Sequence, residues 1–103
     1  MAPAEAWLEQ LSRGSQQKFA ALFARRGDTG NIWNERTFKH LTETDQIFEF
    51  KVEADRILCF FFISRRLILT HGFRKSGDTT PTREFERAES YQHDFEGRVT
   101  HDT

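Results

Sequence analysis

The stretch from Arg56 to Ile63, Arg-Ile-Leu-Cys-Phe-Phe-Phe-Ile, decides the fold of this chain. Its nearly unbroken apolar and aromatic character predicts a strand that is buried on both faces, in the middle of a sheet. On its N-terminal side, residues 47–53 alternate between apolar and charged side chains, which predicts a strand with one buried face and one wet face. On its C-terminal side, residues 67–73 predict a third strand that weakens at Gly72. Short connections at Ala54-Asp55 and Ser64-Arg65 favour antiparallel pairing.

Helical spacing dominates the regions before and after these strands. Apolar residues of 4–26 fall on two helical faces, which predicts a hairpin of two helices covering one face of the sheet, with Ser15 as N-cap of the second. Trp33-Asn34 are expected to begin a short third helix that includes Phe38. Thr80-Pro81 predict the start of a last helix, followed after Gly97 by a frayed tail. The stripe on that helix consists of Phe85, Ala88, Tyr91 and Phe95.

These elements predict one α+β domain over residues 1–103, with an N-terminal helical hairpin packed on a small antiparallel sheet and a C-terminal helix. Its net charge of −1 argues against nucleic-acid binding through bulk charge. The distribution of charge is more informative, because residues 51–75 hold six Lys/Arg against two acids, while both flanking regions are acidic. A rigid sheet that presents clustered cations suits a polyanion such as RNA. Plain solvation of strand ends is the alternative interpretation.

Several other classes of protein are disfavoured. Cys59 is the only cysteine, so an intrachain disulfide is impossible, and its place in an apolar strand predicts a buried thiol. No leader-like segment or membrane-spanning run occurs, and a cytoplasmic protein is expected. Phosphate loops, metalloprotease pairs and nucleophile elbows are missing from the sequence. The four histidines lack ligand spacing, so neither a metal nor a cofactor is expected.

The strand region also carries a family resemblance. The matching pieces are Ile47–Phe50, Asp55–Leu58, Leu67–Phe73, Lys75, Thr80-Pro81 and Ala88. With them the chain resembles the RelE/HigB superfamily of toxins, especially the phage-associated HigB-like branch of type II toxin–antitoxin systems. This resemblance implies a RelE-like α+β domain that cleaves messenger RNA without a metal, usually on the ribosome. It also implies neutralisation by a neighbouring antitoxin protein, for which a helix-turn-helix protein is one candidate.

Three departures from the family pattern leave a second function open. Family members begin with a strand before the helical hairpin, whereas this chain starts at the first predicted helix. A second lysine often follows the position of Lys75, and here it is Ser76. The last helix often carries an aspartate-tyrosine pair, and here it reads Asp94-Phe95. A phenylalanine cannot exchange a proton, so the alternative is a catalytically weak or inactive RelE-fold module that binds protein.

The chemistry implied by the resemblance needs few groups, because RNA supplies its own 2′-hydroxyl nucleophile. Arg56 is the candidate for stabilising charge on phosphate, and its structural alternative is a turn residue paired with Glu53 or Asp55. Lys51 is a candidate phosphate ligand or base, or a solvated strand lysine. His71 is a candidate proton carrier or a hydrogen-bonded core histidine. Further candidates fall where the family's C-terminal catalytic groups lie, namely Tyr91, which shares the apolar stripe, and His93, which faces away from it.

Three more cations are candidates for RNA binding. Arg74 and Lys75 follow the third strand, and we expect both to project from a basic loop at the sheet edge. Arg66 belongs to the same basic region, at the start of that strand. For each of them, simple solvation of an exposed charge is the alternative role.

Overall fold

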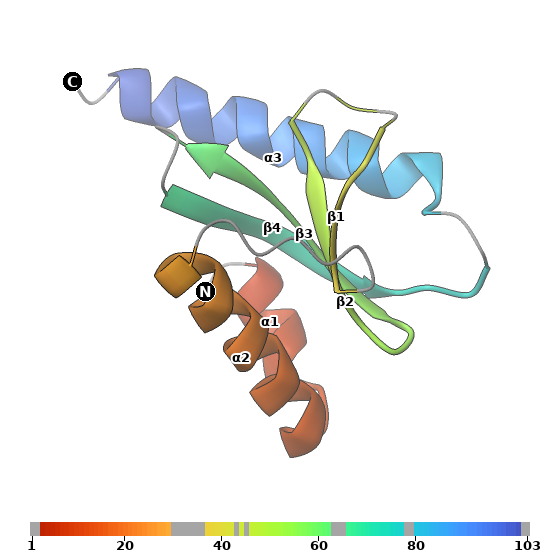
Figure 1. Cartoon of the computed structure of the whole chain (residues 1–103). Coiled ribbons are helices and arrows are strands. Elements are labelled where there is room, and N and C mark those ends of the chain that lie inside the picture. The colour runs from red at the N-terminus through yellow and green to blue at the C-terminus, as the bar shows by residue number, and fades with distance from the viewer. Residues whose placement is uncertain are drawn as a thin grey trace.

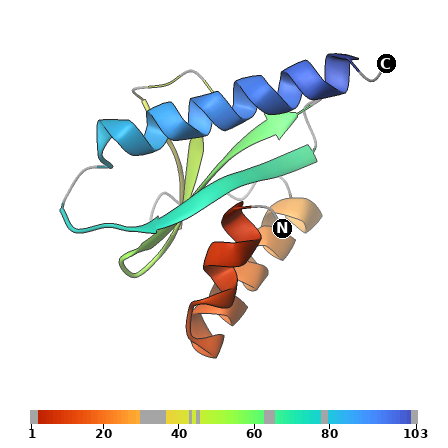
Figure 2. The same ribbon diagram turned by 180° about the vertical axis from the view of Figure 1, so that it is seen from behind.

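The computed structural model describes residues 3–29, 37–42, 44, 46–62, 66–77 and 80–101, and it has the predicted α+β architecture. In chain order its elements are α1 (Pro3–Glu9), α2 (Arg13–Thr29), β1 (Phe38–His40), β2 (Phe48–Val52), β3 (Asp55–Phe62), β4 (Arg66–Arg74) and α3 (Thr82–His101). The strands form one antiparallel sheet in the order β1-β2-β3-β4. Helices α1 and α2 lie on one face of this sheet and α3 lies on the other (Figures 1 and 2).

Strand β3 is the buried centre of the sheet, as its sequence predicts. It pairs with β2 on one side and β4 on the other, and residues 57–60 are fully buried. Leu58 and Phe60 point to the α3 face, whereas Ile57 and Cys59 point to the α1–α2 face. Burying each of these large apolar side chains stabilises the fold by about 1.5–3 kcal/mol. Two core layers therefore meet at residues 57–60, while the polar residues Asp55 and Arg56 lie at the start of the strand.

The helical hairpin is confirmed, but its second helix is capped differently from the prediction. Helix α2 begins at Arg13, so Gly14 and Ser15 lie inside it. The hydroxyl of Ser12 accepts a hydrogen bond from the backbone N–H of Ser15 at 3.2 Å. Ser12 is therefore the N-cap, and the assignment of Ser15 was wrong because two serines three residues apart offer equivalent capping signals.

Strand β1 was not expected. The start of the predicted third helix, Trp33-Asn34, lies outside the described residues, but Phe38 lies in β1, so its assignment to a helix was wrong. Phe38 pairs with Phe50 of β2 and its ring lies 4.6 Å from the Phe50 ring. Three residues contain too little periodicity to indicate a strand. Their extended conformation is stabilised by pairing and packing rather than by local preference.

The β2–β3 connection is a two-residue turn at Glu53-Ala54, because Val52 pairs directly with Asp55. The sequence placed this turn one residue later. Glu53 has a φ of 56°, in the left-handed region that costs an ordinary residue roughly 1–2 kcal/mol. The other predicted connection, Ser64-Arg65, lies outside the described residues.

Helix α3 changes the environment of the second face of the sheet. It buries Phe85 and Ala88 of the predicted stripe against Leu58 and Phe60. The charged face of β2, predicted to be wet, is therefore partly covered, and Glu49 is 0% exposed. The helix begins at Thr82 and continues past Gly97 to His101, where a frayed tail was expected. None of the described helices is long and apolar enough to cross a membrane.

Candidate nucleic-acid interface

Four cationic side chains gather where α3 leaves the sheet uncovered, near the β2–β3 turn. Cross-strand partners share a face, and the register pairs Lys39 with Glu49 and Lys51 with Arg56. Arg56 in turn pairs with Phe73, and strand alternation brings Lys75 to the same side. We call Lys39, Lys51, Arg56 and Lys75 the cationic face. In both ribbon views the β2–β3 turn lies away from α3 (Figures 1 and 2), and all four of these side chains are half-buried.

Lys51 lies at the centre of the cationic face. Partial burial lowers the pKa of its ammonium group below the usual value, and repulsion by the charge of Lys39 lowers this pKa further. Arg56 and Lys75 act in the same direction, while Glu49 opposes them. The local field therefore favours either loss of a proton from Lys51 or the arrival of an anion.

Arg56 is fixed at the β2–β3 turn. Its Nη1 donates to the carbonyl oxygens of Glu53, at 2.5 Å, and Asp55, at 3.1 Å. The alternative role expected for Arg56, a turn residue paired with Glu53 or Asp55, is therefore observed, with the backbone carbonyls of both residues as its partners. Nε lies 3.9 Å from Oε2 of Glu49, and the side chain is 12% exposed. Because Nη2 has no hydrogen-bond partner among the described residues, it is the group of Arg56 that can meet a phosphate.

Arg74 is exposed at the sheet edge, as predicted, but its placement in a loop with Lys75 was wrong. Arg74 is the last residue of β4 and pairs with Asp55, its Nη1 lying 4.0 Å from Oδ1 of that residue. The backbone N–H of Lys75 donates to the carbonyl of Ala54 at 2.7 Å, which continues the ladder. Because successive side chains of a strand point to opposite faces, Lys75 joins the cationic face and Arg74 points to the other side.

Arg66 lies at the opposite end of β4 from Lys75. It is the first residue of this nine-residue strand and is exposed. A rise of about 3.3 Å per residue separates Arg66 from Arg74 by roughly 26 Å. The sequence grouped these cations because they are near one another in the chain, whereas the extended strand separates them.

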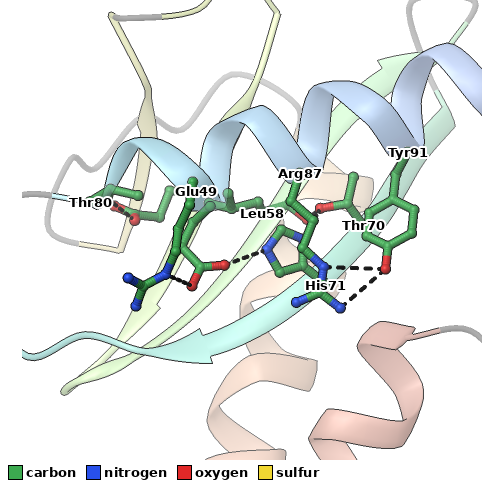
Figure 3. A network of polar contacts seen from close by, with 9 residues as sticks. Glu49, Leu58, Thr70, His71, Thr80, Arg87 and Tyr91 are labelled. Carbon is green, nitrogen blue, oxygen red and sulfur yellow. Dashed lines mark hydrogen bonds and ion pairs between the residues drawn. The ribbon is translucent and has the colours of Figure 1, made fainter.

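Two of the remaining candidates, His71 and Tyr91, lie close together beneath and on α3 (Figure 3). His71 is 1% exposed, with Nε2 at 3.0 Å from Glu84 Oε1 and Nδ1 at 3.1 Å from Thr70 Oγ1. Burial lowers the pKa of His71 more than its contact with Glu84 raises it. Both ring nitrogens are therefore engaged within the protein, which is the arrangement of a hydrogen-bonded core histidine.

Tyr91 and His93 are also separate from the cationic face. The hydroxyl of Tyr91 accepts hydrogen bonds from Arg87 Nε and Nη2 at 3.3 and 3.2 Å, and the Tyr91 ring lies 5.7 Å from the His71 ring. His93 is exposed on α3. Of the five candidate catalytic residues, only Lys51 and Arg56 are brought together at the cationic face.

Three residues at or beside the cationic face were missed by the sequence reasoning. Lys39 was missed because this segment was assigned to a helix, and the three residues of β1 carry no strand signal of their own. Glu49 was taken for a solvated residue. Thr80 was taken for a helix cap, but its hydroxyl donates to Glu49 Oε1 at 2.6 Å (Figure 3). A short sequence window contains no information on the contact between Glu49 and Thr80, because these residues are 31 positions apart in the chain.

The fold is that of a small α+β protein with half-buried cationic side chains gathered at one end of its sheet. Residues 6–92 match the family of phage-derived Gp49-like proteins (DUF891). The chain therefore belongs to this family, which is of the RelE-like toxin type. The matched region includes the whole sheet and the cationic face. No curated protein matches the chain.

Proposed function

We propose that this protein is the toxin of a HigB-like type II toxin–antitoxin pair, and that it cleaves messenger RNA on the ribosome without a metal. The observation that carries the proposal is the convergence of Lys39, Lys51, Arg56 and Lys75 on one open end of the sheet. Like charges repel one another, so such a cluster destabilises the free protein and suits a bound polyanion. Membership in a family of phage-derived toxin-like proteins supports the same function.

The proposed reaction uses the RNA's own nucleophile. The 2′-oxygen forms a bond to phosphorus, the bond from phosphorus to the 5′-oxygen breaks, and a 2′,3′-cyclic phosphate remains. Lys51, whose pKa is lowered by burial and by Lys39, takes the proton of the 2′-hydroxyl. Arg56 Nη2 and the ammonium group of Lys75 stabilise the charge that develops on the phosphate oxygens. The leaving 5′-oxygen takes a proton from water, which reaches this exposed end.

The test is induced expression of the full chain with mapping of new RNA 5′ ends. We expect growth arrest and new ends with the natural sequence, and loss of both with Arg56→Ala at equal protein level. Removing one well-placed charge-stabilising donor lowers the rate on the order of 10²–10³-fold. Arg66→Ala is the matched control, because Arg66 pairs with Phe62 at the other end of β3 and the substitution removes the same charge roughly 20 Å away on the same sheet.

Fold must be monitored in this comparison because Arg56 also holds the β2–β3 turn. Lys51→Gln provides a second variant without that structural role. Intact RNA after induction of the natural sequence, with ribosomes present, would contradict cleavage. Equal loss of activity in Arg56→Ala and Arg66→Ala would show that total charge, rather than the cationic face, matters.

One observation favours the alternative of a RelE-fold module that binds protein without cleaving RNA. Phe95 packs edge-on against Phe60 and Phe62, with ring centroids 5.7 and 5.2 Å apart. The position that often carries a tyrosine in the resembling toxins is thus part of an apolar cluster. Under this alternative the chain still binds its antitoxin partner, for which a helix-turn-helix protein is the candidate. Co-purification of the two proteins without any change in cellular RNA is the result that it predicts.

A further inference from the structure

Glu49 is a carboxylate buried inside the cationic face. It is 0% exposed and lies across the ladder from Lys39 on one side and Leu58 on the other. Oε1 accepts a hydrogen bond from the Thr80 hydroxyl at 2.6 Å. Oε2 lies 3.9 Å from Nε of Arg56, and neither of these two atoms has a hydrogen-bond partner within the described part of the chain.

The buried pair of Glu49 and Arg56 is not arranged to stabilise the fold. A buried ion pair repays the desolvation of its charges only when the geometry is close and the remaining polar atoms are satisfied. Here the contact is long, and one atom on each side lacks a hydrogen bond. Such a pair is explained better by what it does to the orientation of Arg56.

The guanidinium of Arg56 is held from two sides. Nη1 is fixed by the carbonyl oxygens of Glu53 and Asp55, and Nε faces the Glu49 carboxylate. Two anchors define the plane of the guanidinium and direct Nη2 outward. Thr80 restrains the carboxylate itself, because its hydrogen bond ties Glu49 to the connection between β4 and α3.

We propose that Glu49 is a positioning residue, which orients Arg56 so that its remaining donor meets an RNA phosphate at the cationic face. The inference rests on the proposed function, since it concerns the same site. It does not require Glu49 to touch the RNA. It assigns to Thr80 the role of holding the carboxylate in place.

Because Glu49 is negatively charged, the direction in which RNA affinity changes when it is replaced tests this proposal. A carboxylate that acts only through its charge repels phosphate, so Glu49→Gln should tighten RNA binding. A carboxylate that orients Arg56 has the opposite influence, so the same substitution should weaken binding. Glu53→Gln is the matched control, because it removes an exposed negative charge at the turn while the backbone carbonyl that binds Arg56 remains.

The experiment measures the affinity of the full chain for a mixed-sequence, 2′-O-methylated single-stranded RNA by fluorescence anisotropy over a range of salt concentrations. We expect Glu49→Gln to weaken binding about tenfold and to reduce the salt slope by about 0.7, the contribution of one phosphate contact on a single strand. Thr80→Val keeps the charge and loses the hydroxyl, so it should weaken binding in the same direction. Glu53→Gln should leave the affinity unchanged or tighten it.

The outcomes separate the inference from the function on which it rests. If the natural protein shows no salt-dependent binding to this RNA, both are overturned. If it binds and Arg56→Ala weakens binding, but Glu49→Gln tightens it as Glu53→Gln does, the function stands and the positioning role is overturned. Thermal unfolding identifies a variant that has lost its fold. If Glu49→Gln has lost its fold, Thr80→Val replaces it as the test of the positioning role. Unchanged RNA binding by folded Thr80→Val overturns the inference.

Discussion

Replacing Gly72 with alanine should destabilise the protein through a single contact, that with Trp7 of α1. Gly72 lies in β4, and a Cβ atom added there would lie 2.1 Å from Cε3 and 2.3 Å from Cδ2 of the Trp7 ring. Ordinary van der Waals contact begins near 3.4 Å, so the ring would have to move by about 1.3 Å. Trp7 packs in turn against Phe19, at 6.1 Å between centroids, which limits that movement. Overpacking of this kind costs typically about 1–3 kcal/mol.

Urea denaturation followed by far-ultraviolet circular dichroism measures this loss. With a slope of about 1–3 kcal/mol per molar urea, the midpoint should fall by roughly 1 M. Gly97→Ala is a control of opposite sign, because no atom lies within 4 Å of the added Cβ and alanine favours a helix by about 0.5–1 kcal/mol. In a Trp7→Ala background, Gly72→Ala should cost little, since alanine suits a strand better than glycine. An equal cost in both backgrounds would refute the reasoning.

Two further predictions concern His71 and the start of α2. Burial holds the pKa of His71 below its ordinary 6.5, so the unfolded chain binds more protons just below pH 6.5. The free energy of unfolding should therefore fall as the pH drops through 6.5, by at most about 1.4 kcal/mol per pH unit for this group, and His71→Gln should remove that part of the slope in a series of urea titrations. Ser12→Ala should cost about 1 kcal/mol through loss of the N-cap, whereas Ser15→Ala should cost only a few tenths of that. The reverse order of the two serine variants in thermal unfolding would contradict the capping assignment.

The strands and helices that periodicity predicted are those whose residues carry their own signal over many positions. The apolar run of β3 and the alternation of β2 indicate strands whatever the rest of the chain does. Strand β1 has three residues and exists because Phe38 pairs and packs with Phe50. Long-range pairing of this kind has no counterpart in a local window.

The residues of the candidate site also divide into those that a local sequence signal indicated and those that only the fold revealed. Lys51 and Arg56 were found because they flank a tight turn between two recognisable strands, which brings them together at any register close to the observed one. Arg66 was grouped with Arg74 and Lys75 as part of one basic region of the sequence, but the extended strand places it at the opposite end of β4. His71 was open to two interpretations, and its contact with Glu84 of α3 supplies the structural partner.

The sequence by itself determined the order of elements, the central position of β3 and a basic centre between acidic flanks, since hydrophobic period and charge are properties of neighbouring residues. Only the tertiary structure decided which cations share a face. Register puts Lys51 beside Arg56 and Lys39 on the same face two strands away, and alternation sends Arg74 and Lys75 to opposite sides. It also decided that Glu49 is buried and that its carboxylate meets Thr80, which is more than 30 residues away in the chain. Burial depends on what packs against a residue, and that partner is set by the whole fold.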